Sequence, residues 1–323
     1  MNSNQTTDAQ AEGGAQSSSS MLALYGELIK SKQTALLVYT TGFAYLISAW
    51  QTGLDPVLAV TLMLSLFLAV SGSTLLNMYI DRDIDAVMVR TKNRPLPSGK
   101  IDPMKVLGHG MVWVTAGILV AGIFINQVTM LIVALGFILD VVVYSVWLKR
   151  KTPASILFGG IAGGMPALAG RTAVIGTVDI IGVLLALFVI AWIPLHILTL
   201  ALLPDNLEGY REAGVPMWPV VRGEHETMVV ITVSAVVSAF VVVMTGLAMG
   251  LHQVAMLPLV ILSIVIAARA AINLRGPTHE RTFWIFKMAS MYMAFAFFWL
   301  FVGLVITPIL TTIPQFNVPF PWL

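Results

Sequence analysis

The sequence predicts an all-α polytopic membrane protein, and three observations support this fold class. Of the 323 residues, 58% are apolar and 11% charged, whereas soluble globular domains have about 45–50% and about 25%. The mean hydropathy is +0.88. The apolar residues fall into nine runs of membrane-spanning length, each of about 20 residues, which is the length that crosses a bilayer as a helix. The composition therefore argues against a soluble enzyme.

The predicted elements follow a polar N-terminal tail. Residues 1–20 hold no basic residue and no apolar run, so we expect a disordered tail and not a cleaved signal peptide. Residues 21–323 are expected to form a single intramembrane domain. The nine transmembrane helices are predicted at residues 35–51, 56–79, 104–125, 128–148, 154–175, 180–203, 227–250, 254–274 and 282–306.

The distribution of Lys and Arg predicts the orientation, because cytoplasmic loops retain these residues. They gather before the first span, at Lys30 and Lys32, and in the second, fourth, sixth and eighth connections, whereas Arg171 alone falls on the other side. We therefore expect a cell (cytoplasmic) membrane protein with its N-terminus in the cytoplasm and its C-terminus outside.

Charge and cysteine content exclude further classes. The formal net charge of +2 is too small for a nucleic-acid partner, which requires a broad basic face. The sequence has no cysteine, which removes disulfides, thiolate nucleophiles and Cys-ligated metals. Any chemistry must therefore use carboxylates, amides, cations, His or Tyr.

The two longest polar connections follow the second and sixth spans, four helices apart. This spacing is typical of two pseudo-repeated four-helix halves with a ninth helix added. Acidic residues collect in the same two connections, and they are Asp81, Asp83 and Asp85 in the first and Asp205, Glu208, Glu212, Glu224 and Glu226 in the second.

The first acidic connection carries a predicted metal site. Asn77, Asp81 and Asp85 are spaced four apart, so on a helix they form one stripe of side chains, about 12 Å long. Oxygen ligands of this kind suit Mg²⁺, which binds through one or two carboxylates together with substrate phosphates. Carboxylates at the edge of an apolar span are costly and usually functional. The stripe therefore predicts a Mg²⁺ site that binds a diphosphate substrate.

A cationic, proline-containing loop follows the stripe. Its prolines cannot continue a helix, so residues 93–99 are predicted to fold back over the site as a lid. Asp83 lies on the opposite face, where pairing with Arg82 or the loop cations is expected. The cations able to contact a diphosphate are Arg90, Lys92 and Arg94.

These residues carry a resemblance to a known family. The runs at residues 77–85 (NMYIDRDID) and 90–99 (RTKNRPLPSG) resemble the first Asp-rich motif of the UbiA-type intramembrane prenyltransferases, and more narrowly of the branch that farnesylates haem. The resemblance extends from about Tyr25 to the ninth span. Further ordered matches are residues 144–150 (YSVWLKR) with Thr152-Pro153, residues 159–176 (GGIAGGMPALAGRTAVIG) and residues 210–223 (YREAGVPMWPVVRG).

The resemblance implies a reaction and its ligands. A farnesyl group would pass from farnesyl diphosphate to a vinyl group of haem b, giving haem O, with haem b as substrate and not cofactor. It implies Mg²⁺ at the stripe and a haem A synthase or an oxidase-assembly protein as partner. The residues implied are Asn77, Asp81, Asp85 and Lys149 for catalysis, with Arg90, Lys92, Arg94 and Arg150 for the diphosphate.

The second half supplies the acceptor candidates. His196, in the run WIPLH, is expected to contact the haem or a propionate, with a packing role as the alternative. Asp140 lies alone within the fourth span, where an acid is costly. We expect it either to form a helix–helix hydrogen bond or to lie near the acceptor. Tyr144 is expected near the acceptor, and together with Tyr79 and Trp192 it could stabilise a cation.

The second acidic cluster departs from the family pattern, in which an acid precedes the tyrosine. Here Gly209 precedes Tyr210. Asp205, Glu208 and Glu212 have a helical spacing of three and four residues, so which of them binds a second Mg²⁺ stays open, with a solvated loop as the alternative.

Three other functions fit parts of the sequence. The first is a prenyltransferase that acts on an aromatic quinone precursor or another lipid acceptor. The second is a secondary transporter, because paired half-bundles with intramembrane acids also describe carriers. The third is a non-catalytic haem-handling partner of an oxidase assembly, against which the intact stripe argues.

Overall fold

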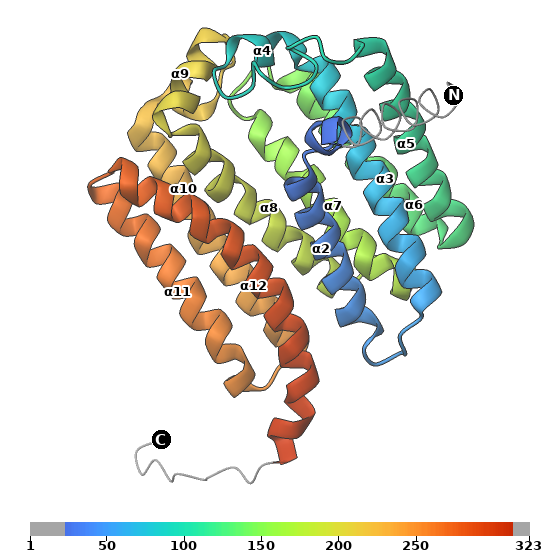
Figure 1. Cartoon of the computed structure of the whole chain (residues 1–323). Helices are drawn as coiled ribbons and strands as arrows, with labels where there is room; N and C mark the ends of the chain where they lie inside the picture. Colours follow the sequence, from blue (N-terminus) through green and yellow to red (C-terminus); the bar gives the residue numbers. More distant parts are fainter. Residues whose placement is uncertain (1–22, 313–323) are drawn as a thin grey trace, which may run out of the picture.

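The computed structural model describes residues 23–312, and all secondary structure in this range is helical (Figure 1). The predicted tail at residues 1–20 lies outside the described residues. Residues 23–28 are helical and precede the first complete element. The elements are α2 (Ser31–Ala49), α3 (Pro56–Ile80), α4 (Arg82–Val87), α5 (Pro103–Phe124), α6 (Gln127–Phe137), the π-helix η1 (Ile138–Leu148), α7 (Ser155–Ile175), α8 (Ile180–Ala201), α9 (Pro204–Glu212), α10 (Trp218–Ala248), α11 (Gln253–Arg275) and α12 (His279–Thr312).

Each predicted span corresponds to one long helix, with α6 and η1 together forming the fourth. Seven of these helices in the described part of the chain are long and apolar enough to cross a membrane. The exceptions are α2, which starts with a polar turn, and α7, which is rich in glycine and contains Arg171. The structure therefore supports a multi-pass helical membrane protein with seven candidate spans, and the count of nine stays a prediction.

Local sequence explains where the helices begin. The Asp55 carboxylate accepts hydrogen bonds from the amides of Val57 and Leu58 and is followed by proline, a combination that satisfies the free amides of a first turn. Asn126 and Asp179 cap α6 and α8 in the same way. The short polar connections of the sequence are therefore helix starts that turn the chain back through the bundle.

The helices pack in the same order in both halves. In the first half α3 packs on α5 and α5 on α6; in the second α8 packs on α10 and α10 on α11. A short polar helix follows α3 and another follows α8. The final helix α12 contacts both α2 and α8 and so joins the halves. This arrangement agrees with the predicted division into two similar halves and an added helix.

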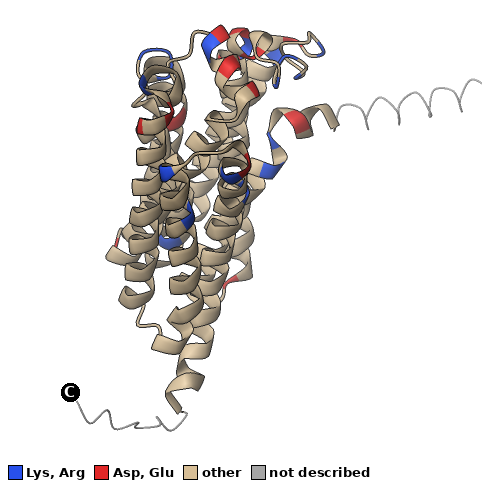
Figure 2. Cartoon of the chain, turned by 90° about the vertical axis from the view of Figure 1, so that its left-hand side faces the viewer, with Lys and Arg blue, Asp and Glu red and all other residues tan. Residues whose placement is uncertain are grey.

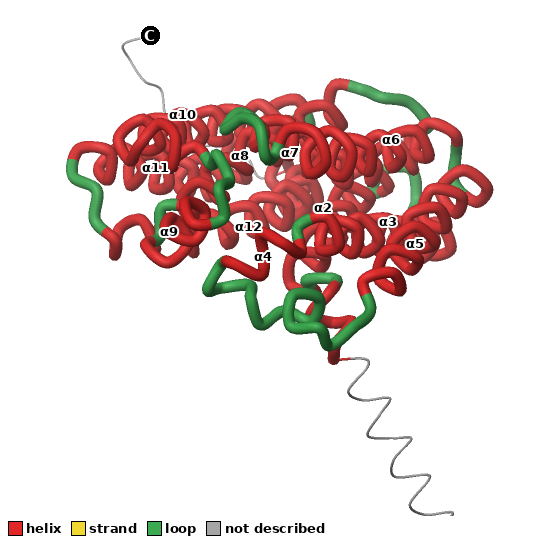
Figure 3. The backbone as a smooth tube through the Cα atoms, turned by 90° about the horizontal axis from the view of Figure 1, so that it is seen from above, coloured by secondary structure: helices red, strands yellow, loops and turns green. Residues whose placement is uncertain are grey.

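Charged side chains gather at the end of the bundle that carries α4 and α9 (Figure 2). Seen from above, α4 and the loop after it project from one long side of the bundle (Figure 3). The predicted cytoplasmic placement of this end rests on the sequence.

Glycine allows a close contact between α2 and α7. A Cβ added at Gly170 would lie 2.5 Å from the Thr41 carbonyl oxygen, and the Thr41 hydroxyl donates to the Pro166 carbonyl at 3.0 Å. Small residues let helix backbones approach in this way inside membranes, where helices gain little hydrophobic free energy from one another.

Gly170→Ala is therefore expected to destabilise the protein by about 1–3 kcal/mol, because the new methyl meets backbone that cannot move aside cheaply. Gly108→Ala is the matched control, since Gly108 lies on the exposed side of α5 with nothing within 4 Å of an added Cβ. Alanine at this position should stabilise the helix by about 0.5–1 kcal/mol, because alanine has a higher helix propensity than glycine. Thermal unfolding in detergent measures both variants, and equal midpoints would contradict the proposed packing.

Candidate active site

The Asp-rich run lies where α3 ends and α4 begins, and the predicted single helix is wrong. The helix α3 ends at Ile80, and Asp81 takes φ −88° and ψ 4° before α4. The Arg150 guanidinium donates to the Ile80 carbonyl at 2.9 Å and so takes the acceptor that a continuing helix would use. Hydrogen bonds from the Asp81 amide to the Asn77 carbonyl (2.9 Å) and from the Asp85 amide to the Asp81 carbonyl (2.8 Å) still link the three residues.

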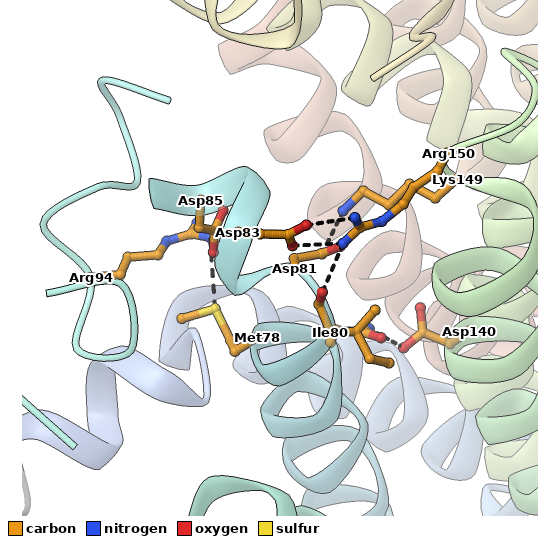
Figure 4. A network of polar contacts seen from close by, with 10 residues as sticks. Met78, Ile80, Asp81, Asp83, Asp85, Arg94, Asp140, Lys149 and Arg150 are labelled. Atoms are coloured by element: carbon orange, nitrogen blue, oxygen red, sulfur yellow. Dashed lines mark hydrogen bonds and ion pairs between the residues drawn. The ribbon is translucent and has the colours of Figure 1, made fainter. Parts of the chain in front are cut away.

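Two buried ion pairs hold the carboxylates of this run (Figure 4). The Lys149 ammonium lies 2.5 Å from Asp81, and the Arg94 guanidinium lies 2.8 Å from Asp85. Both carboxylates are buried, and a buried carboxylate without a partner is strongly destabilising. Arg94 belongs to the loop directly after α4, whereas Lys149 follows η1 and is 68 residues from Asp81 in sequence. The two pairs therefore join the Asp-rich run to the loop after it and to a distant helix end.

The Asp83 carboxylate points the other way and binds Arg150. The guanidinium donates to both of its oxygens, at 2.6 and 2.7 Å, and these bonds lower the pKa of Asp83 to about 2. The expectation that Arg82 or the loop cations pair with Asp83 is therefore wrong. Asp83 and Arg150 are exposed, so the predicted role of Arg150 in diphosphate binding would compete with this pair.

Two oxygens at this site suit a metal ion. Asn77 Oδ1 and Asp81 Oδ1 are buried and have no hydrogen-bond partner among residues 23–312. The Asn77 amide nitrogen donates to Asp140 at 2.8 Å, which leaves the amide oxygen free. Amide and carboxylate oxygens are ligands that Mg²⁺ prefers. The predicted Mg²⁺ ligands therefore fit the metal, with Asp85 as the neighbouring carboxylate.

The described residues contain no group of three His, Cys, Asp or Glu side chains able to hold a metal by themselves. Mg²⁺ sites of this class normally use one or two carboxylates and complete the coordination with water and substrate phosphates. A partial ligand set is thus what a metal–diphosphate site requires of the protein.

The π-helix η1 places Asp140, Tyr144 and Lys149 on one face. Its hydrogen bonds join residues five apart, as from the Lys149 amide to the Tyr144 carbonyl at 2.8 Å. With about 4.4 residues per turn, the nine residues from Asp140 to Lys149 make about two turns. On an α-helix they would make two and a half turns, which would turn Lys149 away. Gly159 on α7 gives the Tyr144 ring room, since a Cβ there would approach it to 3.2 Å.

The loop after α4 is folded over this end of the bundle. Arg94 binds Asp85, and Leu96 is buried against Leu28 and Met78. Arg90 lines the cavity described next, whereas Lys92 is exposed. The loop therefore occupies the place that a lid requires, and its opening and closing stay a prediction.

A cavity of about 690 Å³ extends from this end into the bundle. Along α3 its wall runs from Asn77 to Leu66, roughly 16 Å at the rise of an α-helix. Polar side chains, among them Asp140 and Tyr144, line the end near the Asp-rich run, and deeper positions such as Val133 and Met165 are apolar. This polarity gradient suits a molecule with an anionic head and an apolar chain.

His196 forms part of the cavity wall. Its imidazole is stacked between Trp192 and Phe286, with centroids 4.7 and 4.8 Å away, and Ser290 Oγ lies 3.4 Å from Nδ1. Trp192 also lines the cavity. Tyr79, predicted as a third cation-stabilising ring, is instead covered by the Arg82 guanidinium at 4.5 Å.

A helix distortion presents His196. Pro194 lacks an amide hydrogen, and the adjacent Leu195 amide donates to Ser234 Oγ at 3.0 Å, while the Ser234 hydroxyl donates to the Ala191 carbonyl. A side chain from α10 thus enters the α8 hydrogen-bond ladder, which is a known cause of bends in membrane helices.

The second acidic cluster lies on α9 with its acids outward. Asp205, Glu208 and Glu212 are all exposed. The buried position is Asn206, whose side-chain oxygen has no partner in the described part of the chain. Tyr210 is half-buried one turn later. The four-residue step from Asn206 to Tyr210, like that from Asn77 to Asp81, is the sequence signal that could have identified this inward face.

Comparison with known proteins decides the family. A model of the UbiA prenyltransferase family matches residues 36–301. The chain belongs to this family. A protoheme IX farnesyltransferase of Thermofilum pendens is 41% identical over 276 residues, covering 84% of this chain and 95% of the relative. A protoheme IX farnesyltransferase of Archaeoglobus fulgidus is 36% identical over 286 residues, covering 86% of this chain and 96% of the relative.

Solved structures show the same fold at lower identity. A structure of digeranylgeranylglyceryl phosphate synthase has a TM-score of 0.73 and 21% identity, covering 88% of this chain and 98% of that one. A UbiA homologue from Archaeoglobus fulgidus bound to DMAPP and Mg²⁺ has a TM-score of 0.62 and 16% identity. The match covers 87% of this chain and 99% of the homologue. The helix arrangement is therefore that of UbiA prenyltransferases.

The Asp83–Arg150 pair predicts a pH-dependent contribution to stability. The pKa of Asp83 in the folded protein, about 2, lies below its ordinary value of 3.8, so the pair stabilises the fold above about pH 4 and loses this effect as pH falls through 2. Wild type should therefore exceed Asp83→Asn by a constant amount, below about 1 kcal/mol for an exposed pair, above pH 4. Unfolding midpoints measured between pH 2 and 7 test this, and a gap that does not shrink between pH 4 and pH 2 would contradict it.

Proposed function

We propose that this protein transfers a farnesyl group from farnesyl diphosphate to a vinyl group of haem b, making haem O. The observation that carries the proposal is the pair of unpartnered buried oxygens, Asn77 Oδ1 and Asp81 Oδ1, beside the polar end of a half-apolar cavity. Relatives named protoheme IX farnesyltransferase at about 40% identity support the choice of donor and acceptor.

The donor head would bind at the Asp-rich run. Asn77, Asp81 and Asp85 would hold Mg²⁺, which when bound supplies positive charge to the leaving diphosphate. Lys149 and Arg94 are already held beside these carboxylates at 2.5 and 2.8 Å, so they add fixed charge without reorganisation. The solved UbiA homologue binds DMAPP and Mg²⁺, which supports this assignment.

The cavity would protect the reactive intermediate. When the carbon–oxygen bond of the donor breaks, the electron pair leaves with diphosphate and an allylic cation remains. Apolar walls at Val133 and Met165 exclude water, which otherwise captures such a cation. The rings of Tyr144 and Trp192 line the same space and offer cation–π stabilisation.

The acceptor would lie against the second half of the bundle. The vinyl carbon of haem b forms the new carbon–carbon bond, the charge passes to the carbon beside the ring, and water adds there with loss of a proton. The net reaction consumes one water and releases diphosphate. His196, held flat between Trp192 and Phe286, would position the macrocycle or a propionate.

The proposal also includes a place in the cell. The charged end would face the cytoplasm of the cell membrane, and a haem A synthase or an oxidase-assembly protein would receive the product. Arg90, Lys92 and Arg150 would assist diphosphate binding, and the face of α9 bearing Tyr210 would complete the site opposite the Asp-rich run. Asp205, Glu208 and Glu212, the acids first expected to bind a second Mg²⁺, would need α9 to turn, because they are exposed.

Asp81→Asn should lower haem O formation at least about 100-fold, because it removes charge from the metal ligand and breaks the pair with Lys149. Asp83→Asn is the matched control, two residues away and exposed, and should stay within about twofold of wild type. Membranes supplied with haem b, farnesyl diphosphate and Mg²⁺ are extracted, and haem O is measured by mass spectrometry.

The acceptor is tested in the same membranes. Haem O from wild type and none from Asp81→Asn supports the full proposal. Diphosphate release only with an aromatic acceptor would replace haem b by a quinone precursor. Loss of activity in both Asp81→Asn and Asp83→Asn would contradict the assignment of Asp81 to the site and of Asp83 to the opposite, exposed face.

Asp140 is expected to act on the metal through Asn77, because its carboxylate holds the amide nitrogen and thereby directs the oxygen. Asp140→Leu should weaken metal binding about 10–100-fold, as loss of a supporting hydrogen bond commonly does. Asp140→Asn retains an accepting oxygen and should bind more tightly than the Leu variant. Mn²⁺ titration of the purified protein, followed by electron paramagnetic resonance, measures affinity without turnover, and equal affinities in all three proteins would refute this role.

A further inference from the structure

Lys30 has an unusual backbone. It links the helical residues 23–28 to α2 with φ 47° and ψ 58°, and it is the one non-glycine residue with positive φ in the described part of the chain. This left-handed conformation is normally taken by glycine or asparagine, because a Cβ is strained there. Glycine at this position would remove the strain. Because the sequence has lysine here instead, the strain points to a function of the lysine side chain.

Both sides of this turn are anchored. Leu28 is fully buried against α3, α5 and the loop after α4. On the other side Thr34 is buried, and its hydroxyl donates to the Ile29 carbonyl at 2.6 Å. The amides of Gln33 and Thr34 donate to the Lys30 carbonyl at 2.8 and 3.1 Å. These contacts fix the turn, and the turn sets the direction of the Lys30 side chain.

The Lys30 side chain lines the same cavity as Asn77 and Asp140. Burial, together with the charges of Arg94 and Lys149, lowers the pKa of Lys30 to about 8, although the charges of Asp81 and Asp85 oppose this shift. Lys30 is thus still protonated at neutral pH, and it lies within the electrostatic reach of both buried ion pairs.

Lys30 differs from the other buried cations in being unpaired. Arg94 and Lys149 each contact a carboxylate, whereas Lys30 lies within 4.0 Å of none among residues 23–312. A half-buried ammonium without a counter-ion is costly in the free protein. Its charge is, however, fully available to an incoming anion.

We propose that Lys30 is a ligand of the donor's diphosphate, contacting it from the α2 wall of the cavity. This inference rests on the proposed function. The metal ligands belong to α3 and the short helix after it, and the paired cations belong to the loop and to the end of η1. Lys30 adds a cation on the α2 side of the cavity, where the other lining lysine, Lys32, is exposed, and the strained turn holds Lys30 there.

The substitutions separate charge from backbone. Lys30→Gly removes the ammonium and relieves the left-handed strain, so the variant should unfold at or above the wild-type temperature. Lys30→Met removes the charge and keeps the strain, and Lys30→Arg keeps both. Lys100→Met, an exposed loop position, is the control for loss of one positive charge.

Isothermal titration calorimetry with inorganic pyrophosphate and Mg²⁺ measures binding to the purified protein. We expect at least 10-fold weaker binding in Lys30→Gly and Lys30→Met, with Lys30→Arg and Lys100→Met close to wild type. In turnover assays the KM for farnesyl diphosphate should rise and the KM for haem b should not.

Pyrophosphate binding by Lys30→Gly and Lys30→Met equal to that of wild type overturns the proposal. A rise confined to the KM for haem b also overturns it, because Lys30 would then contact an acceptor carboxylate. Failure of wild type to bind Mg²⁺ and pyrophosphate refutes the proposed function itself, so the two failures are distinguishable.

Discussion

The pairing of buried carboxylates with cations from other segments is the constraint on which this structure depends. Asp81 and Asp85 lie at the end of an apolar helix, where an unpaired carboxylate would destabilise the fold by several kcal/mol. Lys149 and Arg94 remove that penalty. In doing so they fix the end of η1 and the loop after α4 against α3. The same pairs leave one oxygen of Asp81 free, so the contacts that stabilise the fold also leave an oxygen for the proposed metal.

The π-helix follows from this constraint. Asn77 and Asp81 on or next to α3 need partners at two heights of the neighbouring helix, and these are Asp140 and Lys149. An α-helix cannot present residues nine apart on one face, whereas η1 can. The wider helix also carries Tyr144 toward α7, where Gly159 leaves room for its ring. The change from α-helical to π-helical winding thus aligns Asp140, Lys149 and Tyr144 on one face.

The sequence was sufficient for the parts of the fold that depend on composition. Apolar runs, capping aspartates and glycines determine where helices lie, begin and pack. The four-residue spacing of Asn77, Asp81 and Asp85 indicates the proposed metal site. It was insufficient wherever a distant contact decides the local conformation. The break after Ile80 depends on Arg150, more than 60 residues away, and the face of α9 that turns inward depends on tertiary packing. The break leaves no local pattern. On α9 the four-residue step from Asn206 to Tyr210 competes with the equally helical spacing of Asp205, Glu208 and Glu212, so periodicity alone does not tell which face turns inward.

The packing beyond the apolar part of the cavity argues for a transferase rather than a carrier. The cavity wall stops at Val189 on α8 and at Met293 on α12. Phe188, directly next to Val189, and Phe297, one turn after Met293, are fully buried with ring centroids 5.9 Å apart. A carrier must open its site to both sides of the membrane, which would require this aromatic contact to separate. A transferase needs only one polar mouth, because the diphosphate enters and leaves at the charged end while the apolar chain stays in the interior.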